Sequence, residues 1–235
     1  WTSRTRGIDY AQQLNVQGTT IGRNAVIFYE SAFGHFPYAG PHMTDNAAFM
    51  QRHLAKVAAD VAAKIPDPNF NGYAVIDYEF WYPTWSRTAN NRSNLALDAR
   101  DTDFKDDWEE HIRATRPQVI AGLSGDAKER ALASTYNQAA QKFFLDTLRE
   151  AKRVRPNAKW GFYGFPSREY YVTLPAFKTR WQTHHDNELG WMFDAVDVLY
   201  PSVYQLMKLV EDREPTRITS ENSPAQNAEY ILANV

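Results

Sequence analysis

Two carboxylates, Asp77 and Glu79, stand one residue apart at the end of an apolar run that begins at Tyr73. The run is short and contains β-branched residues, which predicts a strand buried on both faces. Side chains alternate along a strand, so the two acids are expected on one face, roughly 7 Å apart along the backbone, with Tyr78 on the other. Two acids that face one space are suited to cleavage of a glycosidic bond. The competing interpretation is an acidic strand end that pairs with surface lysine or arginine.

Aromatic residues crowd the exit of this strand, at Phe80, Trp81, Tyr82 and Trp85. Such rings can stack on sugars, but aromatic residues also fill protein cores. We expect Trp81, Trp85 and Trp191 to pack the scaffold rather than to touch a sugar.

The composition argues against several classes of function. The net charge of −2 leaves no broad basic surface for nucleic acid, and the lysine and arginine run over residues 149–155 is expected to be the solvated end of a helix. The absence of cysteine excludes disulfides and thiolate sites. No apolar stretch is long enough to span a bilayer. The sequence therefore predicts no cofactor, no metal, no nucleic-acid partner and no membrane segment, and it identifies no protein partner.

Strands and long helices alternate along the chain. The sequence predicts strands over residues 25–29, 73–77, 160–166 and 196–204, and helices over residues 44–64, 103–114 and 126–155, the last capped by Asp126. This order favours an α/β fold with parallel strand pairing. The chain contains no linker or internal repeat, so residues 1–235 are expected to form a single domain.

Polar and aromatic residues stand at the ends of all four predicted strands. In parallel α/β folds, ligands bind at the carboxyl ends of the strands. The residues at these ends, which we expect to converge on one site, are Tyr29 with Glu30, Asp77 with Glu79, Tyr163, and Tyr204.

Four segments of the chain resemble the hyaluronidases of bee venom and mammals, glycoside hydrolase family 56. They are residues 26–29, 74–85, 155–166, and 189–191 together with 199–204. The stretch Asp77-Tyr78-Glu79-Phe80-Trp81-Tyr82-Pro83 is the most specific of them, and the tyrosine motifs support it. The order and spacing of the motifs agree over roughly residues 21–210.

This resemblance implies a distorted (β/α) barrel of the TIM type and a secreted, extracellular enzyme. It implies retaining hydrolysis of β-1,4 bonds in polysaccharides that contain N-acetylhexosamine, such as hyaluronan or chondroitin. Glu79 would be the general acid and base, and Asp77 would orient the acetamido group of the substrate, whose carbonyl oxygen is the nucleophile. Tyr163 and Tyr204 would line the acetamido pocket, with Tyr29 and Glu30 nearby.

Three features depart from the family pattern. Tyr82 replaces the family's arginine between the motif tryptophan and proline, which weakens the case for hyaluronan itself. The family's disulfide cysteines are absent. Four strands cannot close a barrel, so we expect the first and last barrel strands to be missing from this chain. Two alternatives remain open: a carbohydrate-binding relative without catalysis, and a chitinase-like hydrolase, which would need an upstream aspartate that residues 71–73 do not provide.

Overall fold

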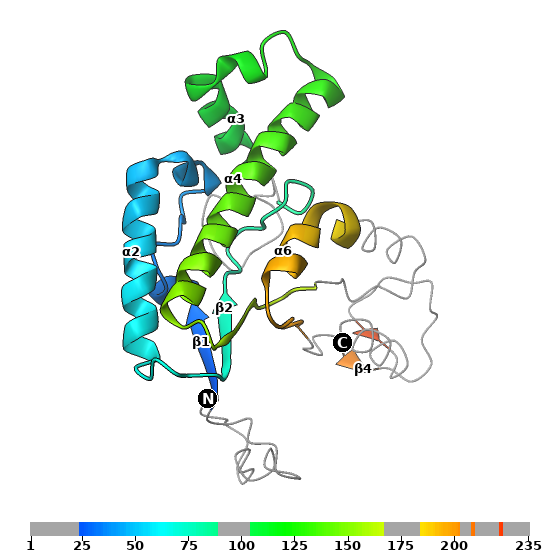
Figure 1. Cartoon of the computed structure of the whole chain (residues 1–235). Coiled ribbons are helices and arrows are strands. Elements are labelled where there is room, and N and C mark those ends of the chain that lie inside the picture. The colour runs from blue at the N-terminus through cyan, green and yellow to red at the C-terminus, as the bar shows by residue number, and fades with distance from the viewer. Residues whose placement is uncertain (1–23, 89–103, 167–183, 203–207, 210–220, 223–235) are drawn as a thin grey trace.

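Figure 1 shows the computed structural model of the chain, which describes residues 24–88, 104–166, 184–202, 208–209 and 221–222. The strands are β1 (Ala25–Tyr29), β2 (Tyr73–Asp77), β3 (Lys159–Phe162), β4 (Lys208–Leu209) and β5 (Glu221–Asn222). The α-helices are α2 (Ala47–Lys64), α3 (Phe104–Thr115), α4 (Gly125–Val154) and α6 (Gly190–Ala195). Short 3-10 helices are η2 (Glu30–Ala32), η3 (Pro41–Asp45) and η4 (Pro117–Val119), and η5 (His185–Leu189) is a π-helix.

The central sheet is parallel and has the strand order β1-β2-β3. Tyr29 pairs with Asp77, and Ile76 pairs with Phe162, so all three strands end at the same edge of the sheet. The expected α/β class and three of the predicted strands are thus confirmed. The described residues form this open sheet and the short β4-β5 pair, and they do not close a barrel.

The predicted strand over residues 196–204 is wrong for the part that the structure describes. Only Tyr200 makes bridges, to Tyr163 and Phe165. Asp197 explains the interruption, because its carboxylate accepts the N–H of Trp160 at 3.1 Å, a donor that a strand partner would otherwise use. Pro201 then has no N–H to continue a ladder. Residues 203–204 lie outside the described residues.

The long helices follow the predicted segments, with differences at their starts. Helix α2 begins at Ala47 rather than Thr44, because the side chain of Asn46 accepts the N–H of Phe49 at 2.9 Å and caps the helix there. Asp126 does not cap α4, since the N-cap position is Ser124. Asp126 instead lies in the first turn, where its charge favours the helix dipole.

An aromatic core holds the sheet against the helices. Helices α2 and α4 lie side by side, and α4 contacts β3 (Figure 1). Phe143 of α4 packs against Tyr78 and Trp81 with ring centroids 5.9 Å and 5.7 Å apart. Trp81 and Trp85 are buried, as expected for scaffold residues, and Trp191 is partly buried against the core. The chain just beyond β2 is therefore anchored by rings that point away from its acids.

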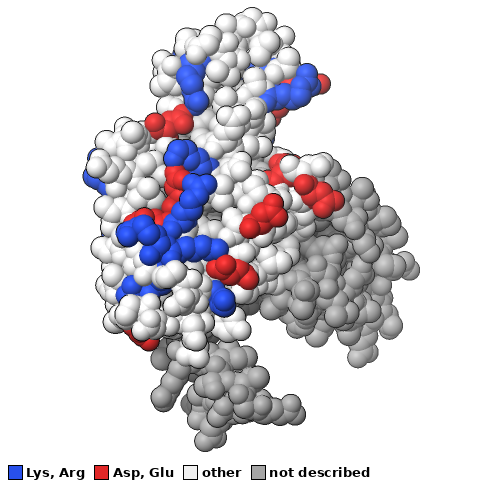
Figure 2. Space-filling model, in the orientation of Figure 1, with Lys and Arg blue, Asp and Glu red and all other residues white. Residues whose placement is uncertain are grey.

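Basic residues gather along α4 on the face shown in Figure 2, with acidic residues between them. Arg149, Lys152 and Arg153 form ion pairs with Asp146, Asp197 and Glu150 respectively. Arg149 and Arg153 are solvated, as expected for the end of a helix. Arg155 differs, because it is only 8% exposed. Its Nε donates to the backbone oxygen of Ile65 at 2.7 Å, which ties the end of α4 to the end of α2.

Gly161 allows residues 197–200 to pass close to β3. A Cβ at this position would lie 2.1 Å from the carbonyl oxygen of Val198 and 2.9 Å from the ring of Tyr200. We expect Gly161→Ala to lower the free energy of unfolding by about 1–3 kcal/mol, as overpacking of a tight site does. Urea unfolding followed by circular dichroism measures the change.

Gly190→Ala is the matched control for this prediction. Gly190 has φ −50° and ψ −42°, and a Cβ there meets open space. Alanine should leave the free energy of unfolding unchanged or slightly raise it. Equal stability of Gly161→Ala and the wild type would show that residues 197–200 do not pack on β3 as described.

Candidate active site

The carboxyl ends of β1 and β2 frame a cavity of about 370 Å³. Asp77 ends β2 and pairs with Tyr29, which ends β1, and Glu30 and Glu79 follow these strands directly. The residues that line the cavity are Tyr29, Glu30, Ser31, Tyr38, Asp77 and Glu79. Four of the six site residues predicted from the sequence, Tyr29, Glu30, Asp77 and Glu79, are therefore brought together.

The two acids lie on one side of the chain, and Tyr78 lies on the other. Tyr78 is only 3% exposed, and its hydroxyl donates to the backbone oxygen of Phe33 at 2.9 Å. Asp77 and Glu79 both face the cavity, which is the alternation expected of an extended chain. Neither acid has an ion pair among the described residues, and no lysine or arginine is among the cavity lining residues of the described chain. This arrangement disfavours the interpretation of an acidic surface strand end.

The environment of Glu79 favours the protonated form of its carboxyl group. Its pKa is raised to about 7, first by burial, then by the negative charge of Asp77 and a hydrogen bond to Asp77, and last by the charge of Glu30. A carboxylic acid that still holds its proton near pH 7 can act as a general acid there.

Asp77 is a half-buried carboxyl group with an unused acceptor. Burial raises its pKa, while a hydrogen bond from Glu79 opposes that rise. Because Glu79 holds the proton between them, Asp77 is the ionised partner. Its Oδ1 is buried and has no hydrogen-bond partner among the described residues. A buried acceptor of this kind is costly unless a ligand supplies the missing donor.

Glu30 interacts with the backbone that carries Glu79. Its Oε2 accepts the backbone N–H of Glu79 at 2.9 Å and that of Phe80 at 3.0 Å. The sequence placed Glu30 near the substrate, but it contained no signal for these two bonds, which join residues that lie far apart in the chain.

The two other predicted tyrosines have different outcomes. Tyr163 follows β3 at the level of Asp77, and its backbone N–H donates to the oxygen of Ile76 at 2.8 Å. Its hydroxyl donates to Ser202 Oγ at 3.0 Å, and Tyr163 is not among the residues that line the cavity. Tyr204 lies outside the described residues.

Two cavity residues were missed by the sequence analysis, Ser31 and Tyr38. Ser31 directly follows Glu30 and could have been found by extending the strand end by one residue. Tyr38 lies in the loop between Gly34 and Gly40, both of which have positive φ. The only signal for Tyr38 was an aromatic residue in a loop at the carboxyl end of a strand.

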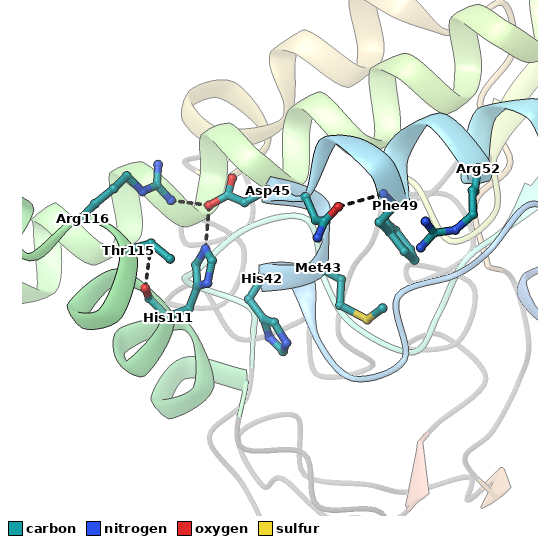
Figure 3. Close-up of a pocket in the computed structure, with 9 residues that line it drawn as sticks. His42, Met43, Asp45, Phe49, Arg52, His111, Thr115 and Arg116 are labelled. Carbon is teal, nitrogen blue, oxygen red and sulfur yellow. Dashed lines mark hydrogen bonds and ion pairs between the residues drawn. The ribbon is translucent and has the colours of Figure 1, made fainter.

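A larger cavity of about 700 Å³ lies between η3, the start of α2 and the end of α3 (Figure 3). Asp45 is the single acid that lines it, and its carboxylate already contacts two other side chains. Its Oδ2 lies 2.8 Å from His111 Nε2 and also pairs with Arg116. These contacts tie α3 to η3, and this cavity lacks the pair of acids found at the strand ends. We therefore take the smaller cavity as the candidate site.

Two general features of the described residues bear on function. None of their helices has the length and apolar character needed to cross a membrane. Among the same residues, no group of three or more His, Cys, Asp or Glu side chains is arranged so that it could hold a metal ion.

Comparison with known proteins gives concordant matches. A family model described as hyaluronidase matches residues 8–222. A chondroitin hydrolase from Caenorhabditis elegans is 35% identical over 198 residues, which is 78% of this chain and 39% of the relative. Hyaluronidase-1 from Bos taurus is 29% identical over 242 residues, which is 96% of this chain and 50% of the relative. The chain thus spans half or less of the length of these two relatives.

The structures of bee venom hyaluronidase are similar in fold. One crystal structure aligns with a TM-score of 0.62 and 27% identity, over 82% of this chain and 58% of that chain. A second, in complex with a hyaluronic acid tetramer, aligns with a TM-score of 0.62 and 26% identity, over 82% of this chain and 59% of that chain.

Proposed function

The chain belongs to the hyaluronidase family, and on that premise we propose that it is a glycosidase that cleaves β-1,4 bonds next to N-acetylhexosamine in hyaluronan or chondroitin. The observation that carries the proposal is the pair of carboxyl groups in one cavity, of which Glu79 holds a proton to about pH 7 while Asp77 is ionised beside it. The chemistry of such a pair is acid catalysis next to a fixed negative charge.

The proposed reaction proceeds with assistance from the substrate. Glu79 donates its proton to the glycosidic oxygen as the acetamido carbonyl oxygen attacks the anomeric carbon, and the leaving sugar departs with a new hydroxyl group. Glu79, now ionised, takes a proton from water, and the water oxygen attacks the same carbon and opens the ring that the acetamido group formed. Two inversions at one carbon leave the configuration retained.

Asp77 orients and stabilises the acetamido group in this scheme. Its buried Oδ1 has no partner among the described residues and can accept the acetamido N–H. Its negative charge also stabilises the positive charge that develops on the acetamido group during the attack. An ionised Asp77 is therefore more useful here as a partner of the substrate amide than as a nucleophile.

The charge of the cavity supports an uncharged sugar at the point of cleavage. Three acids and no lysine or arginine are among the described residues that line it. A uronic carboxylate would be repelled there, whereas an N-acetylhexosamine would not.

Tyr82 stands at the position of the family arginine. The centroids of its ring and the Phe165 ring are 5.4 Å apart, and the guanidinium of Arg87 lies 5.3 Å from the centroid of the Tyr82 ring. We propose both hyaluronan and chondroitin as substrates, in line with the names of the two relatives above.

The architecture beyond the described sheet is also part of the proposal. The parallel β1-β2-β3 sheet would be one section of a distorted (β/α) barrel in a single catalytic domain, with Tyr163 and Tyr204 lining the acetamido pocket. The natural setting would be extracellular, where the polysaccharide substrates lie.

A substrate panel tests the proposed function. The protein is incubated with hyaluronan, chondroitin and chitin oligosaccharides between pH 4 and pH 8, and products are followed by mass spectrometry, with the anomeric configuration read by proton NMR. Cleavage of hyaluronan or chondroitin with retention is expected. Cleavage of chitin alone would support a chitinase-like enzyme, and binding without products would support a carbohydrate-binding protein.

A further inference from the structure

Glu30 makes an unusual pair of contacts for a residue in a substrate cavity. One of its oxygens, Oε2, accepts two consecutive backbone N–H groups, those of Glu79 at 2.9 Å and Phe80 at 3.0 Å. Hydrogen bonds to an ionised acceptor are stronger than those between neutral groups. The carboxylate thus binds the main chain at Glu79, the general acid of the proposed function.

The sheet itself does not hold this part of the chain. Strand β2 ends at Asp77, and its pairing with β3 ends at Ile76, apart from the bond between the Tyr163 N–H and the Ile76 oxygen. Glu79 and Phe80 come after these pairs, and within the described part of the chain their N–H groups are accepted by the Glu30 side chain rather than by a neighbouring strand. Without Glu30, two adjacent donors would have to find water or leave their positions.

Glu30 is itself held on a well-anchored segment. It follows β1 directly and begins η2. The next residues lead to Phe33, which is fully buried, and the ring centroids of Phe33 and Phe28 are 4.6 Å apart. The hydroxyl of Tyr78 donates to the backbone oxygen of the same Phe33 at 2.9 Å. Two sets of hydrogen bonds therefore join the segments that follow β1 and β2. Tyr78 makes one of them in the core, and Glu30 makes the other in the cavity.

We propose that Glu30 is a positioning residue, which fixes the backbone of Glu79 and Phe80 and thereby aims the Glu79 carboxyl group at the glycosidic oxygen. This inference rests on the proposed function, in which Glu79 is the general acid. It gives Glu30 a role different from the substrate contact that the sequence suggested.

The charge of Glu30 adds a second effect on the same group. The titratable groups that share the cavity with Glu79 are Asp77 from β2, Glu30 from η2, Tyr29 from β1 and Tyr38 from the following loop. After burial and Asp77, the negative charge of Glu30 contributes to the raised pKa of Glu79. Removing that charge lowers the pKa, so Glu79 would lose its proton, and the enzyme its activity, at a lower pH.

Two substitutions separate the two effects. Glu30→Gln keeps an oxygen that can accept both N–H groups but removes the charge, whereas Glu30→Ala removes both. We expect Glu30→Ala to lower kcat about 100-fold, the cost of a misplaced catalytic group, with KM changed by less than about 3-fold. Glu30→Gln should retain kcat within about 5-fold, and the alkaline limb of its kcat/KM profile should move to lower pH.

A measurement that does not depend on catalysis completes the test. Amide hydrogen exchange at residues 79 and 80, followed by NMR, should be faster in Glu30→Ala than in the wild type and nearly unchanged in Glu30→Gln. Glu110→Gln is the control, because Glu110 is exposed on α3. It should change neither the exchange nor the pH profile. Thermal unfolding of all variants shows whether each one is folded.

The outcomes distinguish the positioning role from its alternatives. A higher KM with unchanged kcat in Glu30→Ala would overturn the proposal in favour of a substrate contact. Unchanged amide exchange in Glu30→Ala would overturn it as well. If the wild type cleaves no substrate in the panel, the proposed function fails, while the exchange data still decide whether Glu30 fixes residues 79 and 80.

Discussion

Replacing Glu79 with glutamine is expected to lower kcat for hyaluronan or chondroitin by about 1,000-fold or more, within the range that general acid catalysis contributes. Glutamine has nearly the same shape but has no proton of suitable acidity to donate to the glycosidic oxygen. KM should change little, because the substrate contacts remain. Reducing-end assays with purified protein at several substrate concentrations measure both constants. Undiminished turnover would remove Glu79 from the role of general acid.

The Glu79→Gln variant should remain folded. The raised pKa of Glu79 predicts how its stability relative to the wild type changes with pH. Its pKa in the folded protein is about 7 against an ordinary value of 4.5. The folded wild type therefore binds more protons than the unfolded chain between these values, and its stability falls as pH rises from about 4.5 to 7. Glu79→Gln has no such dependence, so its melting temperature relative to the wild type should rise over this window. Glu110→Gln, at an exposed site, should show no such trend.

Replacing Asp77 with asparagine is the second change with a large expected effect. We expect kcat to fall by about 100-fold to 1,000-fold, because a neutral amide cannot stabilise the positive charge on the attacking acetamido group. The loss of a neighbouring negative charge also lowers the pKa of Glu79. The alkaline limb of the kcat/KM profile should therefore move to lower pH, which a pH series from 4 to 8 would reveal.

Asp186→Asn provides the matched control for Asp77→Asn. Asp186 is exposed in η5, so its replacement should leave kcat and the pH profile as in the wild type. If Asp77→Asn kept the wild-type kcat, the acetamido group would have to be oriented by other residues. If kcat fell without any shift of the profile, Asp77 would act on the substrate alone and not on the proton of Glu79.

The candidate site was predictable to the extent that it depends on one strand and its ends. The apolar run from Tyr73 predicted β2, and the alternation of its side chains placed Asp77 and Glu79 together and Tyr78 in the core. Parallel pairing then brought Tyr29 and Glu30 to the same edge, as expected for neighbouring strand ends. The failure at residues 196–202 has a local cause, because Asp197 turns its side chain to the backbone of β3 and replaces a ladder bond.

The amino-acid sequence by itself determined which side chains share one side of the chain at the end of β2, because side-chain direction along an extended chain follows from local stereochemistry. Only the tertiary structure decided how acidic those residues are and what holds them. The raised pKa of Glu79 needs burial by distant segments, and Glu30 reaches the backbone of Glu79 across 49 positions of sequence. Desolvation and hydrogen bonds between remote segments depend on distances through space, which the order of residues alone does not specify.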